Sequence, residues 1–241
     1  MAQLQRLVIS PSQFTNRQIN LTAEQQHYLS RVLRLREGDC FIAMVYGEWW
    51  VAKFLNLDVA EVLEQIPASN ELPVEVVLLV ALPKGNGFED VVRSCTELGV
   101  SCFVPVVSER TLLKPSPQKI ERWRRIAQEA AEQSERQIVP EILEPITYTQ
   151  SLSFVNELSF ICVARGEFPP LLNCLVELRP KLDNTLSKIV ILTGPEGGLT
   201  QQEEAAALKA GFLGVSLGKR ILRAVTAPVV ATSLVSAILT H

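Results

Sequence analysis

Histidine is scarce in this chain, since the 241 residues contain only two, at positions 27 and 241. The five cysteines, at positions 40, 95, 102, 162 and 174, are an odd number. No two of them have the close spacing of a metal knuckle or a redox pair. The sequence therefore predicts no metal site, and the thiols are expected to be reduced groups in the core or near the surface.

Long apolar stretches are also missing. The longest, residues 76–83, is too short to cross a bilayer as a helix. The first nine residues have no apolar run of the length found in signal peptides. We therefore expect a protein of the cytoplasm, without membrane association and with reduced cysteines.

Net charge is low, at −3, which excludes a uniformly basic protein. The charges are nevertheless distributed unevenly. Residues 110–125 carry six basic residues and one acid, Glu121, and a solvated helix face would explain the 119–125 run alone. No acid follows Glu204, whereas four basic residues do: Lys209, Lys219, Arg220 and Arg223. Together the two clusters favour an anionic partner, because a local patch can dominate binding.

Two parts of the chain differ in pattern. Residues 1–70 combine short candidate strands at 6–9, 40–45 and 49–54 with a helix start that Thr22 could cap, which indicates a small β-barrel. A proline-bracketed stretch, 67–73, is the candidate linker. Residues 74–241 alternate strands with helices and predict an α/β domain with a largely parallel sheet. The expected strands are 74–82, 102–107, 160–164, 189–193 and 214–217, and the expected helices are 88–98, 117–138, 201–210 and 228–239.

A glycine-rich loop follows the predicted strand 189–193. It reads Gly194-Pro195-Glu196-Gly197-Gly198, and Thr200 and Glu203 behind it have the spacing of a capping box. Three glycines would let the backbone approach a ligand closely. The loop lacks both the Gly-Lys-Ser/Thr ending of a phosphate-binding P-loop and the dinucleotide fingerprint. A plain strand-to-helix turn is the competing interpretation.

A basic segment lies between the last predicted strand and the last predicted helix. Lys219, Arg220 and Arg223 surround two apolar residues, and no acid lies nearby in sequence. Three cations so close together repel one another unless an anion is supplied, which favours a binding site. These patterns by themselves indicate an α/β protein that binds an anionic or nucleotide-like ligand.

Five segments occur in the order found in one family. They are His27-Tyr-Leu-Ser-Arg31-Val-Leu-Arg34; Thr96-Glu-Leu-Gly-Val100 with Pro105 and Ser108-Glu-Arg110; Ala130-Ala-Glu-Gln133-Ser with Arg136 and Val139-Pro140-Glu141; Gly194–Gly198; and Leu217-Gly-Lys-Arg-Ile-Leu-Arg223. The chain resembles the RsmE family of the SPOUT superfamily over nearly its whole length. Each segment is weak evidence alone, but five in order are strong.

The resemblance implies a SPOUT-type trefoil-knotted α/β methyltransferase domain, residues 74–241, preceded by a PUA-like RNA-binding β-barrel domain, residues 1–70. It implies a homodimer that uses S-adenosyl-L-methionine to methylate N3 of a uridine in 16S rRNA of the small ribosomal subunit. The implied cofactor-binding residues are Ala164, Gly166, Gly194, Pro195, Glu196, Gly197, Gly198, Leu217, Gly218, Ile221, Leu222 and Ala224. The expected RNA contacts are Arg6, His27, Arg31, Arg34, Lys84 and Arg110, and solvated surface residues are the competing interpretation for these.

Methylation at N3 requires loss of a proton from the uracil, and a cation can stabilise the resulting negative charge. Arg223 is the candidate for that cation; a structural ion pair is an equally weighted alternative. The family pattern places an acid two residues beyond this arginine, but here Val225 occupies that position. Glu196 or Glu97 could act as base instead, although bracing of the loop is the favoured role for Glu196.

Three functions therefore remain open on sequence grounds. The first is a uridine-N3 methyltransferase, and the second is another SPOUT enzyme, such as a ribose 2′-O-methyltransferase. The third is an RNA-binding ribosome-assembly protein without catalysis, which the departure at Val225 keeps open. Fold by itself does not separate them.

Overall fold

The computed structural model describes residues 4–182 and 188–240, which form two compact units. Unit 1 comprises the described residues up to 71 together with 131–138, and unit 2 comprises 72–130 and 139 onward. The boundary at 71 falls inside the proline-bracketed stretch. Residues 131–138 group with unit 1, although they lie within the predicted second domain. Among the described helices, none combines the length and apolar character needed to cross a membrane.

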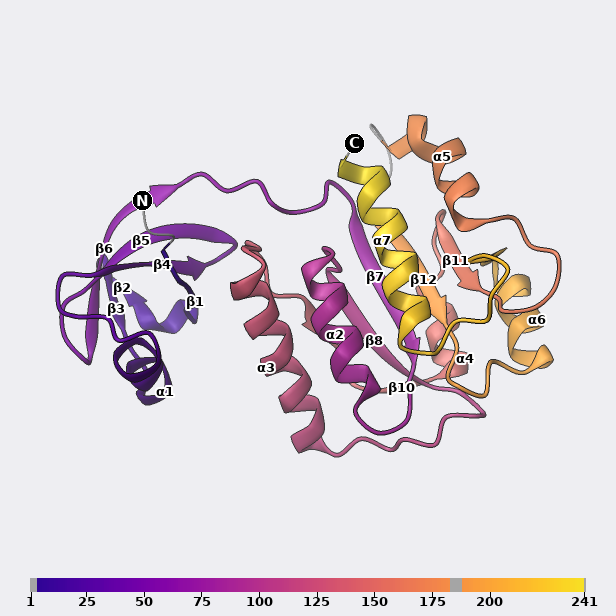
Figure 1. Ribbon diagram of the computed structural model, residues 1–241, viewed down its shortest axis with the longest axis horizontal. Helices are drawn as coiled ribbons and strands as arrows, with labels where there is room; N and C mark the ends of the chain where they lie inside the picture. Colours follow the sequence, from indigo (N-terminus) through magenta and orange to yellow (C-terminus); the bar gives the residue numbers. More distant parts are fainter. Residues whose placement is uncertain (1–3, 183–187, 241) are drawn as a thin grey trace. The chain divides into compact units, whose positions relative to one another are not determined.

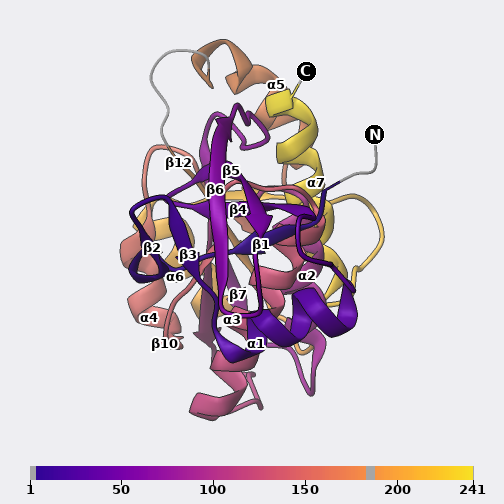
Figure 2. The ribbon, with the colours of Figure 1, turned by 90° about the vertical axis from the view of Figure 1, so that its left-hand side faces the viewer.

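Unit 1 is built on one six-stranded sheet, whose strands are labelled in Figure 2. The strand order is β1 (Arg6–Val8), β4 (Cys40–Val45), β5 (Glu48–Phe54), β6 (Val59–Ile66), β3 (Gln18–Asn20) and β2 (Phe14–Thr15). The pair β1–β4 is parallel and the other pairs are antiparallel. The three predicted strands are confirmed; the other three are additional. Alternate residues of the strands face a core that includes Ile19, Phe41 and Ala52.

A short helix, α1 (Ala23–His27), follows the first strands of unit 1. The side chain of Thr22 accepts a hydrogen bond from the Gln25 backbone N–H, so the predicted cap is present. The helix continues into a π-helical turn, Tyr28–Val32. This element carries His27 and Arg31.

Residues 131–138 are held in unit 1 by hydrogen bonds to Glu71. Its carboxylate accepts from the Gln137 backbone N–H at 2.9 Å and from the Arg136 guanidinium at 2.5 Å. The sequence predicts a helix over 117–138, but α3 ends at Gln133, and Glu135 adopts a left-handed conformation with φ of 62°. The prediction was too long because the apolar spacing continues past the point where these hydrogen bonds replace helical ones.

Unit 2 contains a seven-stranded sheet in which every pairing is parallel. Its order is β10 (Ile146–Thr147), β8 (Cys102–Val107), β7 (Glu75–Ala81), β12 (Lys188–Thr193), β11 (Ser159–Cys162) and β13 (Leu213–Val215), with β9 (Glu141–Ile142) paired to β8. Strand β7 is apolar from Val76 to Ala81 because these residues are buried on both faces of the sheet. The predicted α/β fold with a parallel sheet is confirmed.

Helices cover both faces of this sheet, as Figure 1 shows. The helices α2 (Gly87–Glu97), α3 (Pro117–Gln133), α5 (Leu171–Leu182) and α7 (Thr226–Thr240) pack on one face, and α4 (Tyr148–Ser151) and α6 (Gln201–Ala210) pack on the other. Helix α5 was not predicted, since prolines precede it and interrupt it. The other long helices match the prediction to within two residues at each end, apart from the C-terminal end of α3.

Candidate cofactor and RNA site

Five loops of unit 2 meet at one edge of the sheet. In a parallel sheet all strands end at the same edge, and ligands bind outside these carboxyl ends. The strands β8, β7, β12, β11 and β13 are neighbours in that order. The loops that follow them are therefore neighbours too: residues 108–116, 82–86, 194–200, 163–170 and 216–225. The last three contain all of the predicted cofactor-binding residues.

The loop Gly194–Gly198 turns tightly from β12 toward α6. The Gly198 backbone N–H donates to the Pro195 carbonyl at 2.9 Å, and Gly198 has a φ of 69°, which favours glycine. The predicted capping box is present, because the side chain of Thr200 accepts from the Glu203 backbone and the Glu203 carboxylate accepts from the Thr200 N–H. The loop is therefore fixed at its C-terminal end by the start of a helix.

The two loops that follow β7 and β8 are hydrogen-bonded to the glycine loop. The Glu196 carboxylate accepts from the Lys84 backbone N–H at 2.9 Å, and the Arg110 guanidinium donates to the Gly197 carbonyl at 2.7 Å. A Cβ atom at Gly197 would lie 3.2 Å from Cδ of Arg110, so a larger residue here would crowd the Arg110 side chain. Glu196 thus braces the loop, the role favoured from sequence. Arg110, predicted to contact RNA, is bonded to the cofactor loop.

Glu203 adds a third connection between the loops. Besides capping α6, its carboxylate accepts from the Glu109 backbone N–H at 2.9 Å, and its carbonyl accepts from the Tyr148 hydroxyl at 2.7 Å. Desolvation raises the pKa of the neighbouring Glu204 carboxyl, and the guanidinium of Arg110 opposes that rise. The sequence predicted that Glu203 caps α6. It did not predict the hydrogen bond between Glu203 and Glu109, because the two residues are 94 positions apart.

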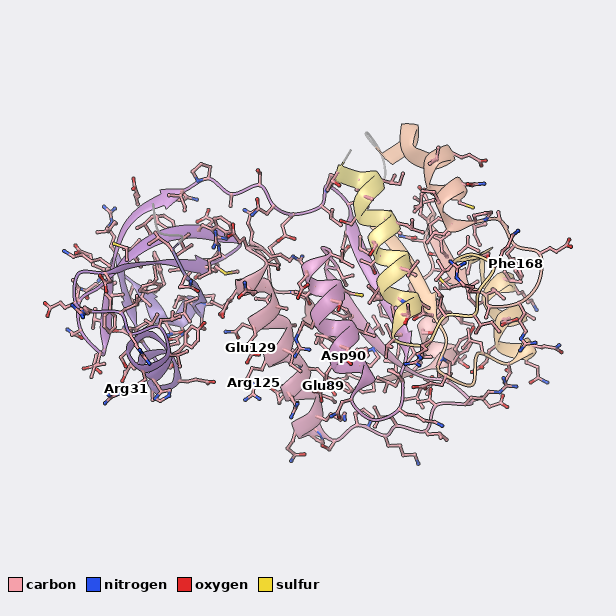
Figure 3. The ribbon with its side chains drawn as sticks, viewed as in Figure 1. Arg31, Glu89, Asp90, Arg125, Glu129 and Phe168 are labelled. Carbon is pink, nitrogen blue, oxygen red and sulfur yellow. The ribbon has the colours of Figure 1, made fainter. Side chains whose placement is uncertain are left out.

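The loops after β11 and β13 are joined to each other. The Ser216 backbone N–H donates to the Pro169 carbonyl at 2.9 Å. Phe168, labelled in Figure 3, lies against Gly214, where an added Cβ would overlap its ring. This contact anchors the segment that contains the predicted residues Ala164 and Gly166, both of which are exposed. Sequence reasoning missed Phe168; an aromatic residue in a polar loop was the available signal.

The segment 217–224 exposes both backbone and apolar side chains. Gly218 has a φ of 113°, and no atom lies within 4 Å of where its Cβ would be. Ile221 is 65% exposed, while Leu217 and Leu222 are half-buried and Ala224 is buried. Open backbone beside apolar side chains suits a flat, partly apolar group with polar edges. The adenosyl part of S-adenosylmethionine has this chemistry, so these residues fit that cofactor.

Three cations on the same segment have no partner among residues 4–182 and 188–240. Lys219, Arg220 and Arg223 are exposed, and none makes an ion pair or side-chain hydrogen bond within the described part of the chain. The Arg223 carbonyl accepts from the Thr226 and Ala227 N–H groups, so this arginine directly precedes α7. The alternative of a structural ion pair for Arg223 finds no support.

The basic run on α3 behaves differently, because its cations have partners. Lys119 donates to the Gly85 carbonyl at 2.9 Å. The three arginines of this run form ion pairs: Arg122 with Glu89, Arg124 with Glu121 and Glu144, and Arg125 with Glu129. Figure 3 labels Glu89 on α2 and both members of the last pair on α3. The expectation that this cluster adds to an anion-binding surface is not supported by these contacts.

Val225 occupies the position where the resembled family has an acid, and the candidate bases Glu97 and Glu196 are poorly placed for that role. Val225 packs against Gly87 at the start of α2, where an added Cβ would lie 2.8 Å from Val225 Cγ1. Glu97 ends the same helix five residues before β8 begins, which puts it at the opposite edge of the sheet. Glu97 is therefore excluded as a base. Glu196 lies in the site, but its carboxylate accepts the Lys84 N–H.

The predicted RNA contacts of unit 1 fall into two groups. His27, Arg31 and Arg34 are exposed and make no side-chain hydrogen bond or ion pair among the residues that the structure describes. Arg6 is engaged internally: its guanidinium pairs with Glu135 at 2.8 Å and stacks 4.6 Å from the ring centroid of Trp49. We therefore withdraw Arg6 as an RNA contact. The ion pair between Arg6 and Glu135 instead helps to hold residues 131–138 in unit 1.

No cluster of three or more histidine, cysteine or acidic side chains suited to a metal ion occurs among residues 4–182 and 188–240. The five cysteines are free thiols, and each is buried or half-buried. Burial raises the pKa of the Cys95 and Cys102 thiols to about 12, so both are protonated at neutral pH.

Comparison with known proteins places the site in a class. Residues 70–236 match the RNA methyltransferase domain family. The chain is 48% identical to ribosomal RNA small subunit methyltransferase E of Synechocystis sp., over 97% of this chain and 78% of that protein. It is 33% identical to the Bacillus subtilis protein of the same name, over 90% and 89% of the two chains. The chain belongs to the family of ribosomal RNA small subunit methyltransferase E.

A solved structure agrees with this assignment. The Neisseria gonorrhoeae ribosomal RNA small subunit methyltransferase E, bound to S-adenosyl methionine, is 29% identical and superposes with a TM-score of 0.82 over 96% of both chains. Its similarity covers both units. The family resemblance found in the sequence motifs is confirmed.

Proposed function

We propose that this protein transfers a methyl group from S-adenosyl-L-methionine to N3 of a uridine in 16S rRNA of the small ribosomal subunit. The family supports methyl transfer to small-subunit rRNA. The observation that carries the proposal is the meeting of the glycine loop with three unpaired cations at the carboxyl edge of the sheet. The cofactor supplies an activated methyl group, and the cations attract and orient the polyanionic substrate.

The cofactor residues are those of the three adjoining loops. Gly194–Gly198 and Gly218 offer open backbone, and Leu217, Ile221 and Leu222 offer apolar contact. Ala164 and Gly166 border the same site from the loop after β11. These residues hold the cofactor so that its methyl group faces the acceptor nitrogen, an alignment that accounts for much of the rate of a displacement reaction.

Arg223 stabilises the negative charge that spreads over the uracil oxygens when N3 loses its proton. This lowers the basicity that the proton acceptor needs, and water at the exposed edge can take the proton. The departure at Val225 is consistent with this route, because Val225 is used in packing against Gly87. His27, Arg31 and Arg34 of unit 1 and Lys84 of unit 2 contact the RNA.

Architecture and assembly follow from the same family. We assign residues 1–70 as a PUA-like RNA-binding domain and residues 74–241 as a trefoil-knotted SPOUT domain. The return of the chain from β13, at the sheet edge, to α7, which contacts β12 and α2, supports the knot. Exposed Leu172 and Val176 on α5 support a homodimer. The cytoplasm remains the expected location of the protein. Light scattering after size exclusion should give twice the mass of the chain.

Nucleoside analysis tests the proposed reaction. Undermethylated small ribosomal subunits are incubated with the protein and the cofactor, and the digested rRNA is examined by mass spectrometry. The expected product is N3-methyluridine. A ribose methyl would instead support the 2′-O-methyltransferase. No methyl group, despite cofactor binding in calorimetry, would support the RNA-binding protein without catalysis that Val225 leaves open.

A further inference from the structure

Thr193 carries a buried hydroxyl without a partner. It is the last residue of β12, has no exposed surface and directly precedes Gly194. Its Oγ1 atom has no hydrogen-bond partner among the described residues. More than nine-tenths of buried polar groups in proteins do have one. An unmade bond of this kind destabilises a folded protein, so its retention calls for an explanation.

The position of this hydroxyl points to the site. Side chains alternate along a strand, and Ile189 and Ile191 lie in the core that α2, α5 and α7 cover. Thr193 shares that face, at the carboxyl end of the strand. Helix α7 contacts β12 and is entered directly from the segment 216–225. The hydroxyl therefore lies on the face of the sheet to which the basic segment leads, at the base of the glycine loop.

The neighbouring strands supply no bond of their own. Thr193 pairs in register with Val80 of β7, and β11 ends beside it at Cys162. Burial raises the pKa of the Cys162 thiol to about 12, so this thiol is neutral and only a weak hydrogen-bonding group. The residues beside Thr193 on the two neighbouring strands are thus an apolar side chain and a neutral thiol.

We propose that the Thr193 hydroxyl is a hydrogen-bonding ligand of the adenosyl group of S-adenosylmethionine, an inference that rests on the proposed function. A hydroxyl both donates and accepts, and adenosine offers ring-nitrogen acceptors, an amino donor and ribose hydroxyls. The apolar surroundings strengthen such a bond and make it selective, because any ligand without a polar atom at that point leaves the hydroxyl unpaired.

Three variants test this. Thr193→Val removes the hydroxyl and keeps the shape, whereas Thr193→Ser keeps the hydroxyl and loses a methyl group. Thr232→Val is the matched control, because Thr232 is equally buried but its hydroxyl contacts Cys95 Sγ at 3.7 Å. Calorimetry measures the affinity of each protein for S-adenosylmethionine and S-adenosylhomocysteine, which share the adenosyl group. Thermal unfolding without ligand is measured in parallel.

Thr193→Val is expected to weaken both ligands about fivefold and to raise the melting temperature of the ligand-free protein by about 2–4 °C. Thr193→Ser should bind like the wild type, and Thr232→Val should change neither affinity. Unchanged binding by Thr193→Val, or a lower melting temperature of that variant, would overturn the inference while leaving the proposed function intact. A wild-type protein that binds neither ligand would remove both.

Discussion

Two basic clusters of similar composition have opposite electrostatic environments. On α3, Arg122, Arg124 and Arg125 are each paired with a carboxylate. On the segment after β13, Lys219, Arg220 and Arg223 are exposed and make no ion pair among the described residues. The first cluster is neutralised within the fold and the second leaves its charge available. The two clusters are alike in composition, and only the positions of the acidic residues distinguish them.

This contrast shows which cations stabilise the fold and which can act on a ligand. Glu89, which Arg122 neutralises, is buried on α2, so that pair contributes to the packing of two helices. Unpaired cations contribute little to stability and repel one another. They are retained where an anion binds. Substitutions in the two clusters should therefore affect different measurements.

The largest effect is expected from Arg223→Ala. Losing one group that stabilises developing charge lowers rates by about 10²–10³-fold. The methylation rate should fall by that factor, while cofactor affinity and the free energy of unfolding stay within a small margin of the wild type. Arg125→Ala is the control, with a normal rate expected. A fully active Arg223→Ala variant would show that charge stabilisation comes from elsewhere.

Arg122→Ala should affect stability instead. The substitution leaves the buried Glu89 carboxylate without its partner, which costs about 1–3 kcal/mol of unfolding free energy. Urea unfolding of the variant measures this, and the double variant Arg122→Ala with Glu89→Gln should recover part of the loss. Methylation per folded molecule should be unchanged. A loss of activity without a loss of stability would place Arg122 in the RNA site.

Lys219→Ala and Arg220→Ala should each alter the salt dependence of RNA binding. Each phosphate contact that is lost reduces the slope of log affinity against log salt concentration by about one. Filter binding of a 16S rRNA fragment between low and physiological salt provides the slope. Lys119→Ala is the paired-cation control, since its ammonium group is bonded to Gly85 and Asn86. Equal slopes for all three variants would show that the two clusters do not differ in their contribution to RNA binding.

The smallest effect is expected from the exposed pair Arg125–Glu129. Its N–O distance is 3.7 Å and both side chains are more than 60% exposed. Pairs of this kind contribute about 0.3–0.5 kcal/mol on a helix. Glu129→Gln should lower the unfolding midpoint slightly in low salt and not at all in high salt. A larger or salt-independent change would mean that Glu129 has a further partner.

Much of unit 2 could be predicted from local pattern. The bounds of α6 follow from its capping box and from Gly211, which ends it in a left-handed conformation. The strand β7 follows from its unbroken apolar run. Short or charged elements gave too little signal: β6, with two acids in eight residues, and the two-residue strands β9 and β10 were not predicted.

Contacts between residues far apart in the sequence could not be predicted in the same way. Arg122 meets Glu89 across 33 positions, and Val225 meets Gly87 across 138. Such contacts depend on how the elements pack, which no local pattern encodes. The position of the cofactor loop was predictable, because it needs only a strand end and a helix start. Its bonds to Lys84 and Arg110 were not.

Those bonds divide the loops at the carboxyl edge of the sheet into two connected groups. The glycine loop is tied to the loop after β7 through Glu196 and to the loop after β8 through Arg110 and Glu203. It therefore belongs to one hydrogen-bonded group with two of its neighbours. The loops after β11 and β13 are joined to each other through Ser216 and form a second group. A ligand at this edge of the sheet would therefore contact two separately connected groups of loops, and the exposed Ile221 belongs to the group that carries the cations.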